Sequence, residues 1–172
     1  TRLSRGLGDV YKRQALYTAG LTSAFVSLLS DQPALHDSLA GLEGAFPRCL
    51  SGIDALLDAG ISVTLNPVIA ATTQGRVVDY MRFVAQRLPR VRSISLSAVQ
   101  PHGRAASNLD LLPDYRVLAE QLPRARAAAA AAGIEVLNPY CGLPLCVGWS
   151  DDLAHCVDCL LYTSPSPRDN RV

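Results

Sequence analysis

The feature that most constrains the fold is a regular alternation between short apolar runs and segments with helical spacing. Residues 23–29 (SAFVSLL) form a short run of β-forming apolar residues bounded by polar ones, which is typical of a buried strand. The runs at 61–66, 91–97 and 134–137 have the same character. The sequence therefore predicts four strands.

The segments between these runs have the apolar spacing of helices. The first begins near Phe46 and ends at Gly60, and the second covers 77–88 and is closed by a proline. The third begins at Pro113, runs through an alanine tract, and carries Pro123, where we expect a kink. The sequence predicts three helices.

Strands that alternate with helices indicate a parallel sheet with right-handed crossovers. We therefore predict an α/β fold, a partial (β/α) barrel of four parallel strands alternating with three helices, followed by an irregular Cys-rich tail. An open sheet is the other arrangement that fits, because four strands cannot close a barrel. In both, chemistry gathers at the C-terminal ends of the strands, here Ser27–Asp31, Asn66 and Ser97–His102.

Both ends of the chain, 1–14 and 159–172, resemble a translated sequencing adapter, read once in each direction, and we expect neither to be native. Lys12, the only lysine, lies in the first of these tails. We expect the native part to consist of the partial barrel at 15–138 and the start of a Cys-rich extension at 139–158.

Residues 15–158 contain ten arginines and thirteen acidic residues, a net charge of −3. This balance argues against a nucleic-acid partner. The sequence also lacks an apolar run approaching the roughly 20 residues that a membrane span needs. We expect neither nucleic acid nor membrane as a partner.

Three stretches of the sequence are informative together. Residues 26–69 contain a His-Asp pair and "GIDALLDAGISVTLNPVI", residues 93–105 read SISLSAVQPHGRA, and residues 141–147 read CGLPLCV. The first stretch is similar to the region between the fourth and fifth strands of radical S-adenosylmethionine (SAM) superfamily enzymes. The second resembles their sixth strand and its loop, and the third resembles a cysteine-bearing tail found in some members.

The resemblance implies a cytoplasmic enzyme that reductively cleaves SAM to a 5′-deoxyadenosyl radical, which abstracts hydrogen from a peptide or a small precursor. It implies SAM and a [4Fe–4S] cluster as cofactors, and an electron donor such as flavodoxin or ferredoxin. The family's cluster-binding C-x-x-x-C-x-x-C loop is absent and would lie upstream of residue 15. The activity is therefore expected of a longer parent protein, and this chain alone is expected to be inactive.

The same resemblance implies SAM contacts from four residues at the strand ends. Ser27 would offer a hydroxyl, Asn66 would meet the ribose or the carboxylate, and Val99 and Gln100 would offer backbone groups to adenine. Structural interpretations remain open, with Ser27 as an ordinary strand residue and Asn66 as a strand terminator.

The neighbouring polar residues depart from the family pattern or have two interpretations. Some relatives carry an arginine shortly after the His-Asp pair, whereas this chain has none until Arg48. We therefore expect His36 and Asp37 to cap a helix or orient a loop. His102 and Arg104 either meet substrate or belong to a solvated loop.

The cysteines divide into two groups. Cys49 lies on or beside an apolar helix face and is expected in the core. Cys141, Cys146 and Cys156 fall in the irregular tail and are candidate ligands of an auxiliary Fe–S cluster or of zinc. Three cysteines are an incomplete set, and simple packing of the tail is the alternative. Cys159 belongs to the adapter-like tail, so its C-x-x-C spacing carries no argument.

Two other functions remain open. An aldolase-type lyase or another (β/α)-barrel enzyme would need a catalytic lysine or a glycine-rich phosphate loop, and residues 15–158 contain no lysine. A non-catalytic zinc-binding module would use the tail cysteines alone.

Overall fold

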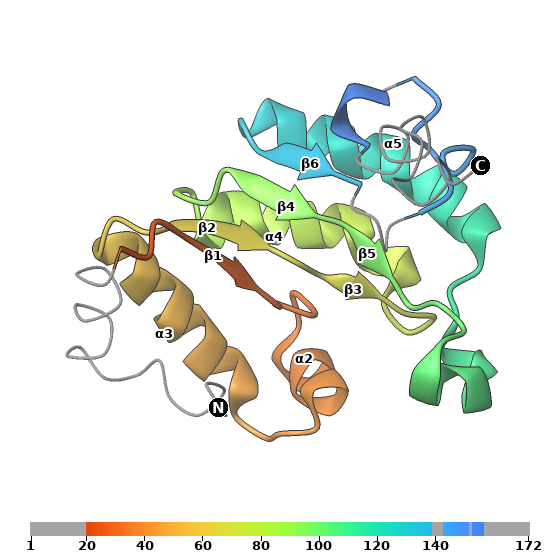
Figure 1. Cartoon of the computed structure of the whole chain (residues 1–172), viewed down its shortest axis with the longest axis horizontal. Helices are drawn as coiled ribbons and strands as arrows, with labels where there is room; N and C mark the ends of the chain where they lie inside the picture. The colour runs from red at the N-terminus through yellow and green to blue at the C-terminus, as the bar shows by residue number, and fades with distance from the viewer. Residues whose placement is uncertain (1–19, 139–142, 152, 157–172) are drawn as a thin grey trace, which may run out of the picture.

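The computed structural model describes residues 20–138, 143–151 and 153–156 (Figure 1). Four strands form a parallel sheet in the order β1-β2-β4-β6. Their bounds are Ser23–Val26 (β1), Ser62–Leu65 (β2), Ser93–Ser95 (β4) and Glu135–Leu137 (β6). The prediction of an α/β fold with these four parallel strands is confirmed.

Two of the strands continue past a break. Asn66 N donates to Val26 O (2.8 Å), and Pro67, which has no N–H to donate, follows directly. The chain then resumes as β3 (Val68–Ile69), which pairs in parallel with β5 (Ser97–Ala98) in a separate two-stranded sheet. The predicted strand at 91–97 is thus two short strands, separated at Leu96.

The three predicted helices are present as α3 (Ala45–Asp58), α4 (Val77–Arg87) and α5 (Tyr115–Ala131). In Figure 1, α4 lies behind the sheet as drawn. The apolar faces of these helices share one core with alternate strand residues such as Leu65 and Ile94, which are fully buried. One face of the sheet is therefore covered by helices.

The start of α5 differs slightly from the prediction. Asp114 caps the helix by accepting from Arg116 N (2.9 Å), so α5 begins at Tyr115 and not at Pro113. The helix runs on through Pro123 without ending.

A fourth helix corrects the prediction of three. Helix α2 (Pro33–Ala40) occupies the loop expected after the first strand, and β1 ends at Val26 rather than continuing to residue 29. Pro33 suits a first helical turn, and Gly41 ends the helix with φ of +64°. At eight residues, α2 is too short to display a convincing apolar repeat.

After β6 the chain makes turns and a 3₁₀ segment (Leu153–His155), with an isolated parallel bridge between Asn138 and Cys156. Leu143, Val147 and Trp149 from this tail are buried in the main core. The described strands form an open sheet and do not close, so the barrel remains a prediction. Among the described residues, no helix has the length and apolarity to cross a membrane.

Candidate functional site

Among the described residues, the face of the sheet opposite the helices is lined mainly by polar side chains, with Phe25 as an apolar exception. Residues of this face alternate with the core residues along each strand, and one row across the sheet is Phe25, Thr64, Ser93 and Glu135. We call this surface the helix-free face. By the same alternation Ser27, Asn66 and Ser95 belong to it, one step nearer the C-terminal ends of the strands.

Two of the predicted strand-end positions meet directly. The Ser97 hydroxyl donates to Asn66 Oδ1 (2.9 Å), across 31 positions of sequence. Ser97 is buried and Asn66 is half-buried. Because Oδ1 is engaged by Ser97, the Asn66 amide nitrogen is left to donate toward the helix-free face.

Ser27 lies beside this pair at the end of β1. It follows Val26, whose carbonyl accepts from Asn66 N, and its own side chain is exposed. The strand-end rule thus placed Ser27 and Asn66 at adjacent strand ends. The SAM-binding roles of both residues remain predictions.

In the loop expected to meet adenine, some backbone groups form hydrogen bonds within the protein. Val99 N donates to Ile69 O (2.9 Å), and Gln100 O accepts from His102 N (2.7 Å). The Val99 N–H and the Gln100 C=O are therefore used inside the protein. His102 is exposed, as a solvated loop residue would be.

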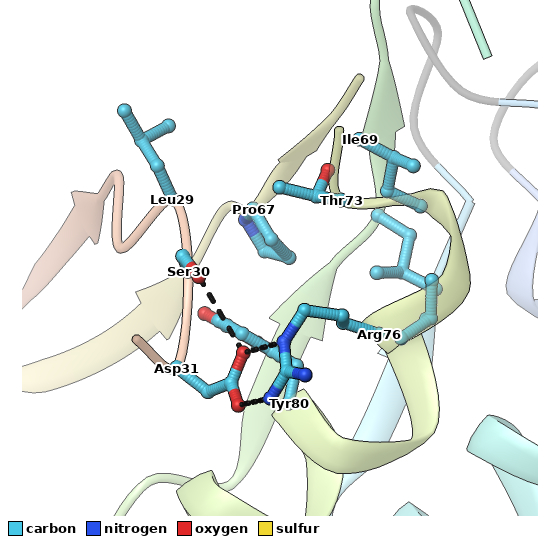
Figure 2. Close-up of a pocket in the computed structure, with 10 residues that line it drawn as sticks. Leu29, Ser30, Asp31, Pro67, Ile69, Thr73, Arg76 and Tyr80 are labelled. Carbon is cyan, nitrogen blue, oxygen red and sulfur yellow. Dashed lines mark hydrogen bonds and ion pairs between the residues drawn. The ribbon is translucent and has the colours of Figure 1, made fainter. Parts of the chain in front are cut away.

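An ion pair that the sequence did not indicate lies close by (Figure 2). Arg76, just before α4, donates from Nε to Asp31 Oδ1 (3.1 Å) and from Nη2 to Asp31 Oδ2 (2.5 Å). The Asp31 side chain is only 10% exposed, and hydrogen bonding to it raises the pKa of Arg76. This bidentate pair joins the segment after β1 to the start of α4.

A small cavity adjoins the ion pair, lined by residues that include Ser30, Asp31, Arg76 and Tyr80. Its volume of about 20 Å³ is room for one water molecule and far too little for a nucleoside. A ligand the size of SAM therefore does not fit in this cavity.

His36 and Asp37 have the structural roles that we expected. His36 is buried, and its Nδ1 accepts from Leu29 N (3.1 Å). The Asp37 carboxylate accepts from Gly44 N (2.6 Å) and Phe46 N (2.7 Å) at the start of α3. Burial acts to raise the pKa of Asp37, but these backbone N–H groups together with His36 hold it below its usual value.

The cysteines occupy different surroundings. Cys49 is half-buried with its Sγ 3.8 Å from Ser27 O, and burial raises the pKa of its thiol to about 11. Cys146 is exposed, whereas Cys156 is buried and its Sγ accepts from Asn138 Nδ2 (3.7 Å). Cys141 lies outside the described residues. Within the part of the chain that the structure describes, no three potential ligands gather into a metal site.

Comparison with known proteins gives one informative match. No family model matches the sequence. Over 128 residues the chain is 31% identical to the PqqA peptide cyclase of Rhizobium meliloti (strain 1021). The aligned region is 74% of this chain but 34% of the relative, so the chain spans about a third of that protein's length. PqqA peptide cyclase is a radical SAM enzyme, and the similarity supports a distant relationship to that superfamily for this portion of a protein.

Proposed function

We propose that this chain is part of a radical SAM enzyme that acts on a peptide. The observation that carries the proposal is the 31% identity to a peptide cyclase over 128 residues. The strand-end cluster of Asn66, Ser97 and Ser27 supports it independently, because the chemistry of parallel α/β folds gathers at that edge. Since the chain spans about a third of the relative, the activity belongs to a longer parent.

The described residues at this edge fit part of what SAM requires. SAM carries an amino acid group and a ribose, both rich in oxygen acceptors, so its site needs amide and hydroxyl donors. Asn66 supplies an amide nitrogen, Ser97 holds the amide in place from behind, and Ser27 offers a hydroxyl. In our proposal the Asn66 amide nitrogen donates to a ribose or carboxylate oxygen, and Val99 and Gln100 flank the adenine.

The cofactors supply the difficult chemistry and the protein supplies position and shielding. Bound SAM, reduced through a [4Fe–4S] cluster whose ligands are not in this chain, would supply a 5′-deoxyadenosyl radical for hydrogen abstraction. The helix-free face is the surface on which a peptide could approach that radical. We further propose a cytoplasmic parent that receives electrons from a flavodoxin or a ferredoxin.

The tail cysteines are proposed as ligands of an auxiliary Fe–S cluster, together with ligands outside the described residues. Cys146 is exposed and so accessible to such a cluster, whereas Cys156 would have to exchange its contact with Asn138. Iron and sulfide analysis of the parent with Cys146→Ala should show the loss of one cluster. Bound zinc with no iron would instead favour a structural zinc module.

The test of the proposed function is SAM cleavage by the anaerobically purified parent. With dithionite as reductant, we expect 5′-deoxyadenosine to appear by mass spectrometry. Asn66→Ala should weaken SAM binding about tenfold, the effect of losing a hydrogen bond to a polar or charged ligand group. Gln86→Ala, at an exposed amide side chain on α4, is the matched control and should bind as the unaltered protein does. Absence of 5′-deoxyadenosine from the reduced parent with its cluster in place would reject the proposal.

A further inference from the structure

Tyr80 presents a buried hydroxyl with no hydrogen-bond partner. The residue lies on α4 and is 4% exposed, and among the residues that the structure describes none gives its Oη a hydrogen-bond partner. Buried polar groups in native proteins are almost always paired, with protein or with an ordered water. A hydroxyl at this depth therefore points to a partner other than the described side chains and backbone.

The Tyr80 side chain lies against the small cavity beside the Asp31–Arg76 ion pair (Figure 2). The cavity's volume of about 20 Å³ exceeds the minimum for one water molecule, so one water fits. Ser30 and Asp31 bring polar groups to the same cavity, and Pro67, Ile69 and Leu96 form its apolar walls.

Asp31 has acceptor capacity left for such a water. Its Oδ1 accepts from Arg76 Nε and, at 3.4 Å, from the Ser30 hydroxyl, while its Oδ2 accepts from Arg76 Nη2. A carboxylate offers about four acceptor positions, so at least one remains after these three hydrogen bonds. The carboxylate is also close enough to Tyr80 for its charge to act on the phenol.

We propose that one ordered water occupies this cavity, accepts a hydrogen bond from Tyr80 Oη and donates one to the Asp31 carboxylate. Through the water, Tyr80 links α4 to residues 29–31, the segment that follows β1 and adjoins Ser27 at the candidate site. The water site is formed by the described residues alone, so it holds whether or not the parent binds SAM.

The first test is Tyr80→Phe, which removes one oxygen and keeps the ring. In urea unfolding of the complete chain, the loss of a satisfied hydrogen bond should raise the unfolding equilibrium constant about fivefold. Tyr115→Phe is the matched control, because Tyr115 is 39% exposed, and it should change that constant less than about twofold. If Tyr80→Phe leaves the constant unchanged or lowers it, the hydroxyl is unpaired and the proposal is wrong.

The second test asks whether the water links Tyr80 to Asp31. In a double-mutant cycle of Tyr80→Phe with Asp31→Asn, a bridging water predicts non-additive effects, with the double variant unfolding less readily than the product of the single effects. Additive effects would overturn the bridge. A high-resolution crystal structure should show an ordered water within hydrogen-bond distance of Tyr80 Oη, and an empty cavity there would also overturn it.

Discussion

At the scale of single residues, Cys49 and Cys146 differ in both exposure and chemistry. The Cys49 thiol is half-buried and its pKa is raised by burial to about 11, so it is protonated at neutral pH and a poor nucleophile. Cys146 is exposed. We predict that iodoacetamide at pH 8 labels Cys146 at least about tenfold faster than Cys49 in the metal-free protein, measured by peptide mass mapping. Equal rates would show that α3 does not shield Cys49.

His36 gives the chain a specific pH dependence. Burial lowers the pKa of His36, partly opposed by the nearby Asp37 charge, and its Nδ1 must stay unprotonated to accept from Leu29 N. The folded protein therefore disfavours the protonated form. The stability that His36 contributes is fully present above the unfolded-state pKa of about 6.5 and is lost as pH falls toward the lower folded-state pKa.

His36→Gln should remove that component of the pH dependence, measured as the urea midpoint between pH 7.5 and 5.5. His102→Gln, at an exposed loop histidine, is the control and should retain it. A full pH dependence in His36→Gln would mean that another group is responsible.

At the scale of elements, the tail after β6 is held to α5 by close backbone packing. Gly148 has φ of +75°, and a Cβ built there would lie 2.9 Å from Leu122 Cβ. Its carbonyl accepts from Arg126 Nη1 (2.7 Å), and the same guanidinium lies 4.7 Å from the centre of the Trp149 ring. The segment that carries Cys146 is therefore docked on α5.

Gly148→Ala should destabilise the protein by about 2 kcal/mol, because alanine adds both a left-handed backbone penalty and a steric overlap. Gly75→Ala is the matched control, since Gly75 has an ordinary backbone conformation and nothing within 4 Å of an added Cβ. Thermal unfolding of the two variants measures the difference. Equal melting temperatures would show that the tail is not docked as described.

Helices and strands could be predicted where the sequence pattern that marks them lies within the element itself. The spacing of apolar residues located α3 and α4 closely, because both are long enough to repeat their buried face. Helix α2 was missed because it is a single short stretch, although Pro33 and Gly41 mark its ends. The separation of β3 from β2 follows from Pro67 only once the neighbouring strand is known.

In the candidate site, contacts that follow from the strand arrangement could be predicted, whereas contacts that depend on side-chain packing could not. Asn66 and Ser97 could be placed together because the ends of parallel strands share one edge. The Asp31–Arg76 pair joins residues 45 positions apart, and nothing in the sequence favours Arg76 over the other arginines as a partner. The unpaired Tyr80 hydroxyl is a property of packing and has no sequence signal.

At the scale of the whole molecule, the described sheet has helices packed on one side and a polar helix-free face on the other. Strand β1 lies at one end of the strand order, and Phe25 on this strand is 62% exposed. In a closed (β/α) barrel, a neighbouring strand would pair with the open edge of β1. The helix-free face, with Phe25, would line the barrel interior and be shielded from solvent. Our account therefore predicts further strands in the parent, upstream of β1.

The central claim is that the parent is a radical SAM enzyme, and the DNA that encodes it tests this most directly. Longer sequencing reads from the same source would give the reading frame upstream of Ala15. We predict a C-x-x-x-C-x-x-C motif there, directly after a predicted strand and some tens of residues before Ser27. A complete upstream sequence without that motif would contradict the account.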